Sequence, residues 1–95
     1  MLVVRLLIWD SWNVTHLAKH EITPDQVEEM CSGNPIVQTG HSGRLLVFGS
    51  IKSGKMITAV LDREEEGIYY PVTARSASRR ERAIYRQEKE VKTHD

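Results

Sequence analysis

The feature that most constrains the fold is a strand-rich stretch in the second half of the chain. Four segments rich in Val, Ile, Leu, Thr and Tyr follow one another, at residues 35–39, 44–51, 55–62 and 68–75. They are separated by GHSG, KSGK and REEEG, whose Gly, Ser and charged residues are typical of tight turns. Because such short connections join antiparallel neighbours, the stretch predicts a four-stranded meander. Pro71 cannot donate a hydrogen bond to a sheet, so we expect an edge position or a bulge there.

A helix is expected directly before this meander. In ITPDQVEEMCSGN, Thr23 suits the N-cap, Pro24 the first helical position and Gln26 the reciprocal position of a capping box. Ile22 and Val27 are spaced as a hydrophobic staple across the cap. Local sequence alone therefore predicts this helix.

The remaining segments complete the architecture. Residues 2–9 are apolar apart from Arg5 and are expected to form a strand, too short for the roughly 20 residues that span a bilayer. A short helix is expected over residues 12–20 and a closing helix over about residues 78–91. We therefore expect one domain, residues 1–95, of the α+β class. In it, two N-terminal helices and a C-terminal helix pack on an antiparallel sheet.

Charge is divided unevenly along the chain. The formal net charge is zero, but residues 74–95 carry a net charge of +3 and residues 1–73 a net charge of −3. Five arginines lie within ARSASRRERAIYR, residues 74–86. This pattern indicates one local site for an anionic partner and excludes a broad basic surface. Taken alone, the segment is more commonly a solvated helix face with Glu–Arg pairs.

Three stretches of the chain resemble the BrnT family of bacterial toxins, part of the wider RelE-like group of small ribonucleases. They are IWDSWNVTHLAKHEITPDQVEEM, GRLLVFGSIKSGKMITAVL and YPVTARSASRRERAIY, and they cover nearly the whole chain. The residues that carry the resemblance are Trp9, Asp10, Asn13, Lys19, His20, Gly43, Arg44, Thr73, Ala74, Arg75, Glu81, Arg82 and Tyr85.

The resemblance implies an mRNA-cleaving toxin that inhibits translation and needs no metal or other cofactor. It also implies a cognate antitoxin, typically with a ribbon-helix-helix DNA-binding part, through which the complex would contact operator DNA. No membrane partner is expected, and the single cysteine, Cys31, favours a reducing, cytoplasmic location. A protein of this fold that has no catalytic activity and acts only by binding other proteins is the alternative.

Metal-free RNA cleavage determines the roles expected of the basic residues. The 2′-OH attacks the adjacent phosphorus, so cations must stabilise the anionic phosphorane that forms. Arg75 and Arg82 are expected to clamp this phosphate, because a guanidinium matches phosphate oxygens and stays charged. The residues expected to bind flanking RNA are Lys19, Arg44, Arg79 and Arg86. For Arg44, a side chain that simply ends in water is the favoured alternative.

The same reaction needs groups that take up and release protons. Glu81 is a candidate base if apolar neighbours raise its pKa, and an ion pair within the helix is its alternative. His20 is a candidate acid or base, or else a histidine that stabilises a helix C-terminus. Tyr85 is a candidate hydrogen-bond donor, stacking residue or weak acid, or else half-buried packing.

The first expected helix also carries aromatic and imidazole side chains. His16 and His20 are four residues apart, which suits two metal ligands on one face. A third ligand would have to come from Cys31, His41 or His94, and no spacing brings these together, so no metal is expected. Trp12 is expected to be a core or partner-interface anchor.

Overall fold

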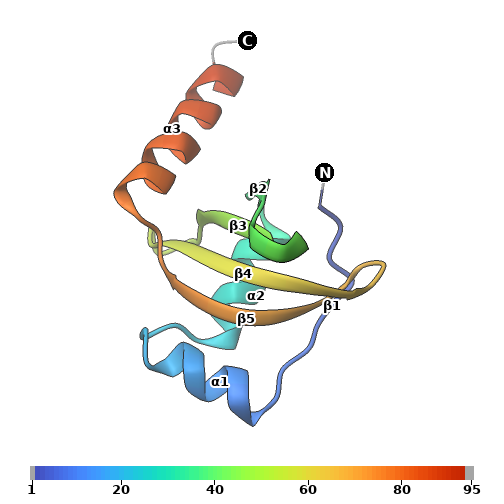
Figure 1. Cartoon of the computed structure of the whole chain (residues 1–95). Helices are drawn as coiled ribbons and strands as arrows, with labels where there is room; N and C mark the ends of the chain where they lie inside the picture. The colour runs from blue at the N-terminus through green and yellow to red at the C-terminus, as the bar shows by residue number, and fades with distance from the viewer. Residues whose placement is uncertain (1, 94–95) are drawn as a thin grey trace.

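The chain forms a mixed α+β domain in the computed structural model, which describes residues 2–93, with side chains described up to Lys89. The elements in chain order are β1 Leu6–Leu7, α1 Ser11–Ala18, α2 Pro24–Ser32, β2 Ile36–Thr39, the 3₁₀ turn η1 His41–Gly43, β3 Leu45–Ser50, β4 Met56–Glu65, β5 Ile68–Ser76 and α3 Arg79–Thr93. One five-stranded sheet has the strand order β1-β5-β4-β3-β2 (Figure 1). The predicted class, with two N-terminal helices and one C-terminal helix on a sheet, is confirmed. Within residues 2–93, no helix is long and apolar enough to cross a membrane.

Strands β2 to β5 form the expected antiparallel meander. β4 continues through Glu65, so the expected turn over residues 63–67 shrinks to residues 66–67. The expected strand over residues 2–9 is wrong in length, because only Leu6 and Leu7 pair with β5, and they do so in parallel. The chain then leaves the sheet and reaches Asp10, whose side chain caps α1.

Pro71 lies at an irregularity in β5, as expected. The pairing of β4 with β5 shifts register opposite residues 71–73. Past the end of β1, the Pro71 carbonyl accepts a hydrogen bond of 3.1 Å from the buried Asn13 side chain. The same Asn13 nitrogen donates to the Ile8 carbonyl at 2.9 Å. The side-chain amide of Asn13, in α1, thus donates a hydrogen bond to β5 where no neighbouring strand among the described residues does so.

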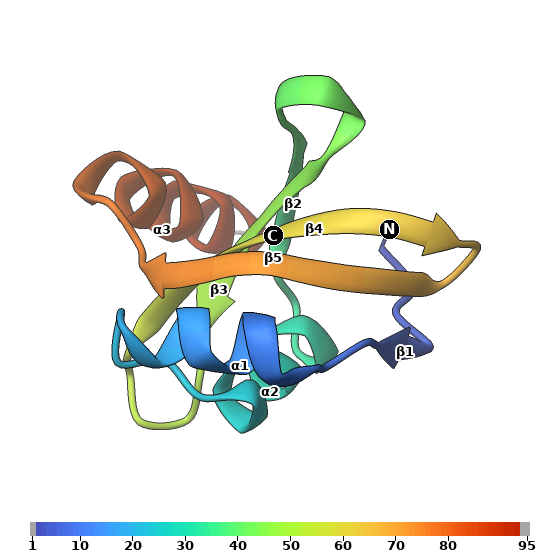
Figure 2. The same cartoon turned by 60° about the horizontal axis from the view of Figure 1, so that its bottom comes forward.

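α3 lies on the opposite side of the sheet from α1 and α2, and rises away from one end of it (Figures 1 and 2). α1 and α2 cover the face that carries the main core, which includes Leu17, Ile22, Val27, Met30, Val47, Ile57, Ala59, Leu61 and Ala74. Successive strand residues point to opposite faces, so Phe48, Thr58 and Arg75 lie on the α3 side. Figure 1 shows α1 ending and α3 beginning at the same end of the sheet, one below it and one above.

Candidate phosphate-binding site at the start of α3

A capping box fixes the first turn of α3. Ser78 Oγ accepts a hydrogen bond of 3.1 Å from the Glu81 backbone, and Glu81 Oε1 accepts one of 2.8 Å from the Ser78 backbone. One residue earlier, the Ala77 backbone donates to the Met56 carbonyl at 2.9 Å. The helix therefore starts at a fixed point beside β4.

Glu81 lies between this turn and the sheet and is only 8% exposed. Its Oε1 and Oε2 accept bonds of 2.8 and 2.9 Å from the Arg75 guanidinium, and Thr58 Oγ1 donates to Oε1 at 2.7 Å. The hydrogen bonds from Arg75, assisted by those from Ser78 and Thr58, outweigh burial and lower the pKa of Glu81 to about 2. The expected upward shift is therefore wrong. Glu81 stays ionised at neutral pH, where it orients Arg75, and its lowered pKa makes it a weak base.

Arg75 keeps hydrogen-bonding capacity despite this pair. Its Nη1 also donates to the Ser76 carbonyl at 3.3 Å, so three of the five N–H groups of a guanidinium are used. The side chain is 41% exposed. Among the described residues, Arg75 is thus a fixed donor with capacity left for a ligand, although Glu81 compensates its charge.

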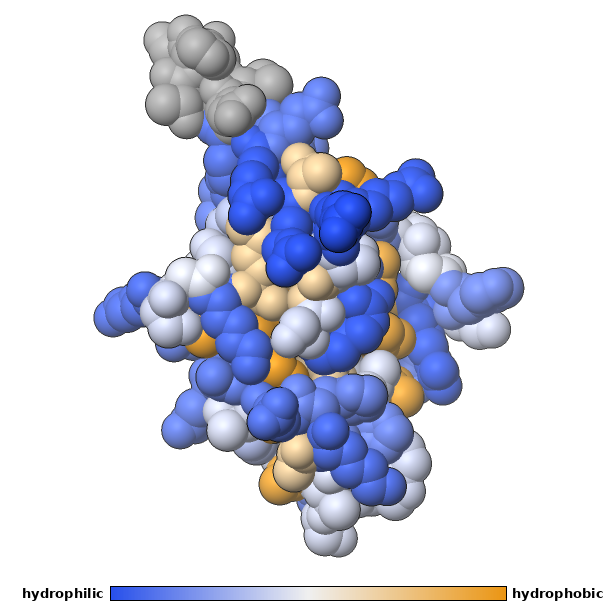
Figure 3. All heavy atoms as spheres, turned by 90° about the vertical axis from the view of Figure 1, so that its left-hand side faces the viewer, coloured by the Kyte–Doolittle hydropathy of each residue, from blue (hydrophilic) through white to orange (hydrophobic). Residues whose placement is uncertain are grey.

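The other arginines of α3 have no ion-pair partner within the part of the chain whose side chains are described. Arg79, Arg80, Arg82 and Arg86 are all exposed, and none of them forms an ion pair with any described residue. We call these four residues the α3 arginine cluster. Figure 3, which looks onto this end of the molecule, shows hydrophilic side chains gathered around the start of α3. The cluster therefore provides positive charge on the helix that begins four residues after Arg75.

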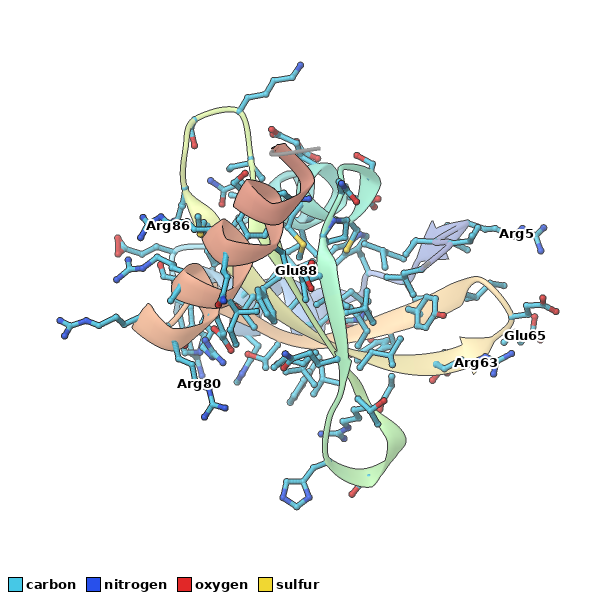
Figure 4. All side chains as sticks on the ribbon, turned by 90° about the horizontal axis from the view of Figure 1, so that it is seen from above. Arg5, Arg63, Glu65, Arg80, Arg86 and Glu88 are labelled. Carbon is cyan, nitrogen blue, oxygen red and sulfur yellow. The ribbon has the colours of Figure 1, made fainter. Side chains whose placement is uncertain are left out.

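The members of the cluster point to different sides of α3. Arg79, Arg82 and Arg86 share the outer face, since they lie three and four residues apart. Arg80 lies on the opposite flank and lines a hollow of about 250 Å³ between α3 and the β2–β3 pair, together with Gln38, Leu46, Ser78, Glu81 and Ile84. Figure 4 shows Arg80 and Arg86 pointing away from the helix in different directions.

Tyr85 ties the middle of α3 to β3. Its hydroxyl lies 3.2 Å from Ser50 Oγ, and the Lys89 ammonium lies 5.0 Å from the centre of its ring. Lys89 also donates to the Asn34 carbonyl at 2.8 Å. Tyr85 is half-buried, so its position corresponds to the packing alternative noted for it.

The structure separates the remaining candidates from this site. Lys19 and His20 lie at the end of α1, across the sheet from α3 but at the same end of it. Arg44 lies at the opposite end of β3, where its Nε bonds Asp62 Oδ1 at 2.9 Å in an exposed pair. Lys19 and His20 thus share one end of the sheet with the start of α3, whereas Arg44 lies away from it.

Several residues at the site were not singled out from the sequence. The Ser-x-x-Glu spacing of Ser78 and Glu81 is a readable capping-box signal that identifies both as builders of the helix start. Thr58 can be identified as part of the site only once the β4–β5 register is known, because that register pairs it with Arg75. Arg80 could be found by placing it on its helical flank, away from the other three arginines.

No metal or thiol chemistry is apparent among the described residues. Within them, no three His, Cys, Asp or Glu side chains lie close enough together to hold a metal ion. His94 lies outside the described residues. Cys31 is buried, and burial, with a contribution from Glu28, raises the pKa of its thiol to about 12.

Two comparisons of the sequence with known proteins found no match. No known family model matches the chain, and no curated protein matches it significantly. The functional argument therefore depends on the site and on the motifs described above.

Proposed function

We propose that this protein is a metal-independent endoribonuclease toxin of a type II toxin–antitoxin system, which cleaves mRNA in the cytoplasm and so inhibits translation. The observation that carries the proposal is the start of α3, where an oriented guanidinium lies beside exposed arginines without carboxylate partners among the described residues. A phosphodiester that becomes a dianionic phosphorane needs both features: donors fixed in advance and net positive charge.

The two arginines of the proposed clamp have different tasks. Arg75 is held by Glu81 and offers its remaining N–H groups to a phosphate oxygen. Arg82 follows Glu81 directly and supplies charge that is not already compensated. Arg79 and Arg86 extend the positive surface along the outer face of α3, where they would hold flanking phosphates.

His20 is the proposed proton-transfer residue. Lys55 Nζ donates to the carbonyl of Glu21, the residue after His20, at 3.3 Å, and Lys55 directly precedes the β4 residue that binds Ala77. This chain of contacts links the end of α1 to the start of α3. RNA that bends around this end of the sheet would meet both groups. Tyr85, which is bonded to Ser50, supports α3 in this proposal.

The distribution of charge suits the same proposal. The acidic run Glu64, Glu65 and Glu66 lies at the β4–β5 hairpin, and Figure 4 shows Glu65 far from Arg80 and Arg86. An RNA bound at α3 therefore avoids these carboxylates. A cognate antitoxin of the ribbon-helix-helix type would cover the toxin, and the complex would bind operator DNA through the antitoxin.

Controlled induction in bacteria tests the proposal. The intact chain should arrest growth, and Arg82→Ala should relieve the arrest without unfolding the protein, because Arg82 is exposed. Arg63→Ala is the matched control, since Arg63 is an exposed arginine at the far end of β4. In vitro, cleavage should persist in EDTA, leave a 2′,3′-cyclic phosphate and stop when the scissile nucleotide is 2′-deoxy. Normal growth during strong induction of the intact chain would count against the proposal.

One observation favours a second function, a protein-binding module without catalysis. Glu81 is bonded to Arg75 and its pKa of about 2 makes it a weak base, so the site at α3 lacks the base of raised pKa that was first expected there. In that case purified protein would leave RNA intact at any pH, and Arg82→Ala would alter only the affinity for a protein partner.

A further inference from the structure

The exposed side of α1 carries a ladder of aromatic and imidazole rings. Trp12 is 60% exposed, yet its ring stacks on His16 with centroids 5.3 Å apart and an interplanar angle of 2°. The His16 and His20 rings follow at 5.6 Å in an edge-on arrangement. Asn13 and Leu17 are fully buried on the other side of the helix, which fixes the ladder in place. Neither Trp12 nor His16 is part of the buried core.

The ladder borders a hollow of suitable chemistry. About 380 Å³ of space is lined by Ser11, Trp12, Thr15, His16 and Lys19. The lining thus combines a ring face, two hydroxyl groups and an ammonium, and it includes no carboxylate. By contrast, Trp9 has a partner within the fold, since its indole N–H donates to Glu28 at 2.9 Å. Trp12 is the tryptophan that offers its surface to solvent.

We propose that Trp12 and His16 form a stacking site for an unpaired RNA base, with Lys19 binding an adjacent phosphate. Every nucleobase has a π-face that stacks on aromatic side chains, and nearby cations bind the backbone between stacked bases. The mixed polar and cationic lining favours RNA over an apolar protein segment. The role of the site in cleavage rests on the proposed function, whereas base stacking itself does not.

The position of α1 links this site to the α3 arginine cluster. The ladder runs along α1 toward His20, and Figure 1 shows that α1 ends where α3 begins across the sheet. A single strand held at α3 that bends around this end would therefore reach His20 and Lys19 first and Trp12 next. The stacking site would select unpaired over base-paired RNA.

Tryptophan fluorescence tests the proposal directly. In a Trp9→Phe background, Trp12 is the only tryptophan left. The probes are a single-stranded RNA hexamer with 2′-O-methyl sugars, which resists cleavage, and an abasic hexamer with the same phosphates. The base-bearing hexamer should quench Trp12 and bind at least about 10-fold more tightly than the abasic one, from the usual strength of base–aromatic stacking.

Substitutions make the test specific. In the Trp9→Phe background, fluorescence anisotropy of labelled RNA should show a loss of about 10-fold or more for Trp12→Ala, and near-normal affinity for Trp12→Phe. Val14→Ala, which changes an exposed residue on another face of α1, should leave the affinity unchanged. Circular dichroism of each variant verifies the fold.

Equal affinity for the two hexamers, or unchanged RNA affinity in Trp12→Ala, would overturn the stacking site. Loss of affinity for a protein partner alone would overturn it as well, in favour of a protein-docking surface. These outcomes are independent of the proposed function: base-dependent quenching by a chain that neither cleaves RNA nor arrests growth would refute the catalytic proposal only.

Discussion

Replacing Glu81 by Gln tests whether this carboxylate holds the start of α3 in place. Glutamine is nearly isosteric and can still accept a hydrogen bond from the Ser78 backbone, so the capping box is kept. The substitution removes the charge that pairs with Arg75 through bonds of 2.8 and 2.9 Å. The change in stability therefore reports the ion pair rather than the cap.

The pKa of Glu81 gives the size of the effect. Its drop from 4.5 to about 2 corresponds to an upper limit of roughly 3–4 kcal/mol, at about 1.4 kcal/mol per pH unit. Because Arg75 is 41% exposed, solvent screening reduces this to about 2 kcal/mol. The folded pKa lies below the unfolded one, so the stabilisation is present above about pH 4.5 and is lost as pH falls toward 2.

Urea denaturation at a series of pH values measures both quantities. At pH 7, Glu81→Gln should lower the free energy of unfolding by about 2 kcal/mol, and the gap to the intact chain should narrow between pH 4.5 and pH 2. Glu88→Gln, an exposed change on the same helix, is the control and should have little effect. If Glu81→Gln matches Glu88→Gln at pH 7, or if the gap is independent of pH, the reasoning about the ion pair is refuted.

Two further predictions concern the faces of the sheet. Asn13→Ala should lower the free energy of unfolding, measured by urea denaturation, by about 2–3 kcal/mol, because it leaves the carbonyls of Ile8 and Pro71 without their donor. A loss as small as that of the exposed control Val14→Ala would contradict this. Phe48→Ala should lower the free energy of unfolding by about 3–5 kcal/mol and make α3 more sensitive to proteolysis, because Phe48 is buried on the side of the sheet where α3 packs. If limited proteolysis is the same as for the intact chain, α3 does not depend on Phe48.

Local signals in the sequence predicted the elements whose causes are local. The cap formed by Thr23 and Gln26 starts α2 as expected, and short turns produce the meander of β2 to β5. The first strand was overestimated because an apolar run does not determine which residues find a pairing partner. Val3 and Leu6 remain 63% and 55% exposed, and only two residues of the run pair with β5.

The candidate site was predicted only in part, for a reason that concerns distance along the chain. The arginines of residues 79–86 lie on one helix, so their common location at α3 follows from the helix itself, whereas Arg75 belongs to β5. The state of Glu81 depends on Thr58 and Arg75, which come together only through the β4–β5 register. From the sequence, apolar neighbours were expected to raise the pKa of Glu81, whereas the hydrogen-bond donors in the structure lower it.

This environment changes how the arginine-rich motif is interpreted. A solvated helix face would have its carboxylate pair with neighbouring helix arginines in solvent, but Glu81 turns inward and bonds a strand residue. Glu81, the single carboxylate of the stretch, is thus paired with Arg75 and forms no ion pair with Arg79, Arg80, Arg82 or Arg86. Exposed arginines close together at the start of a helix repel one another, and this repulsion destabilises a small domain unless a bound anion neutralises it. This repulsion is the physical reason to expect a phosphate-bearing ligand at α3.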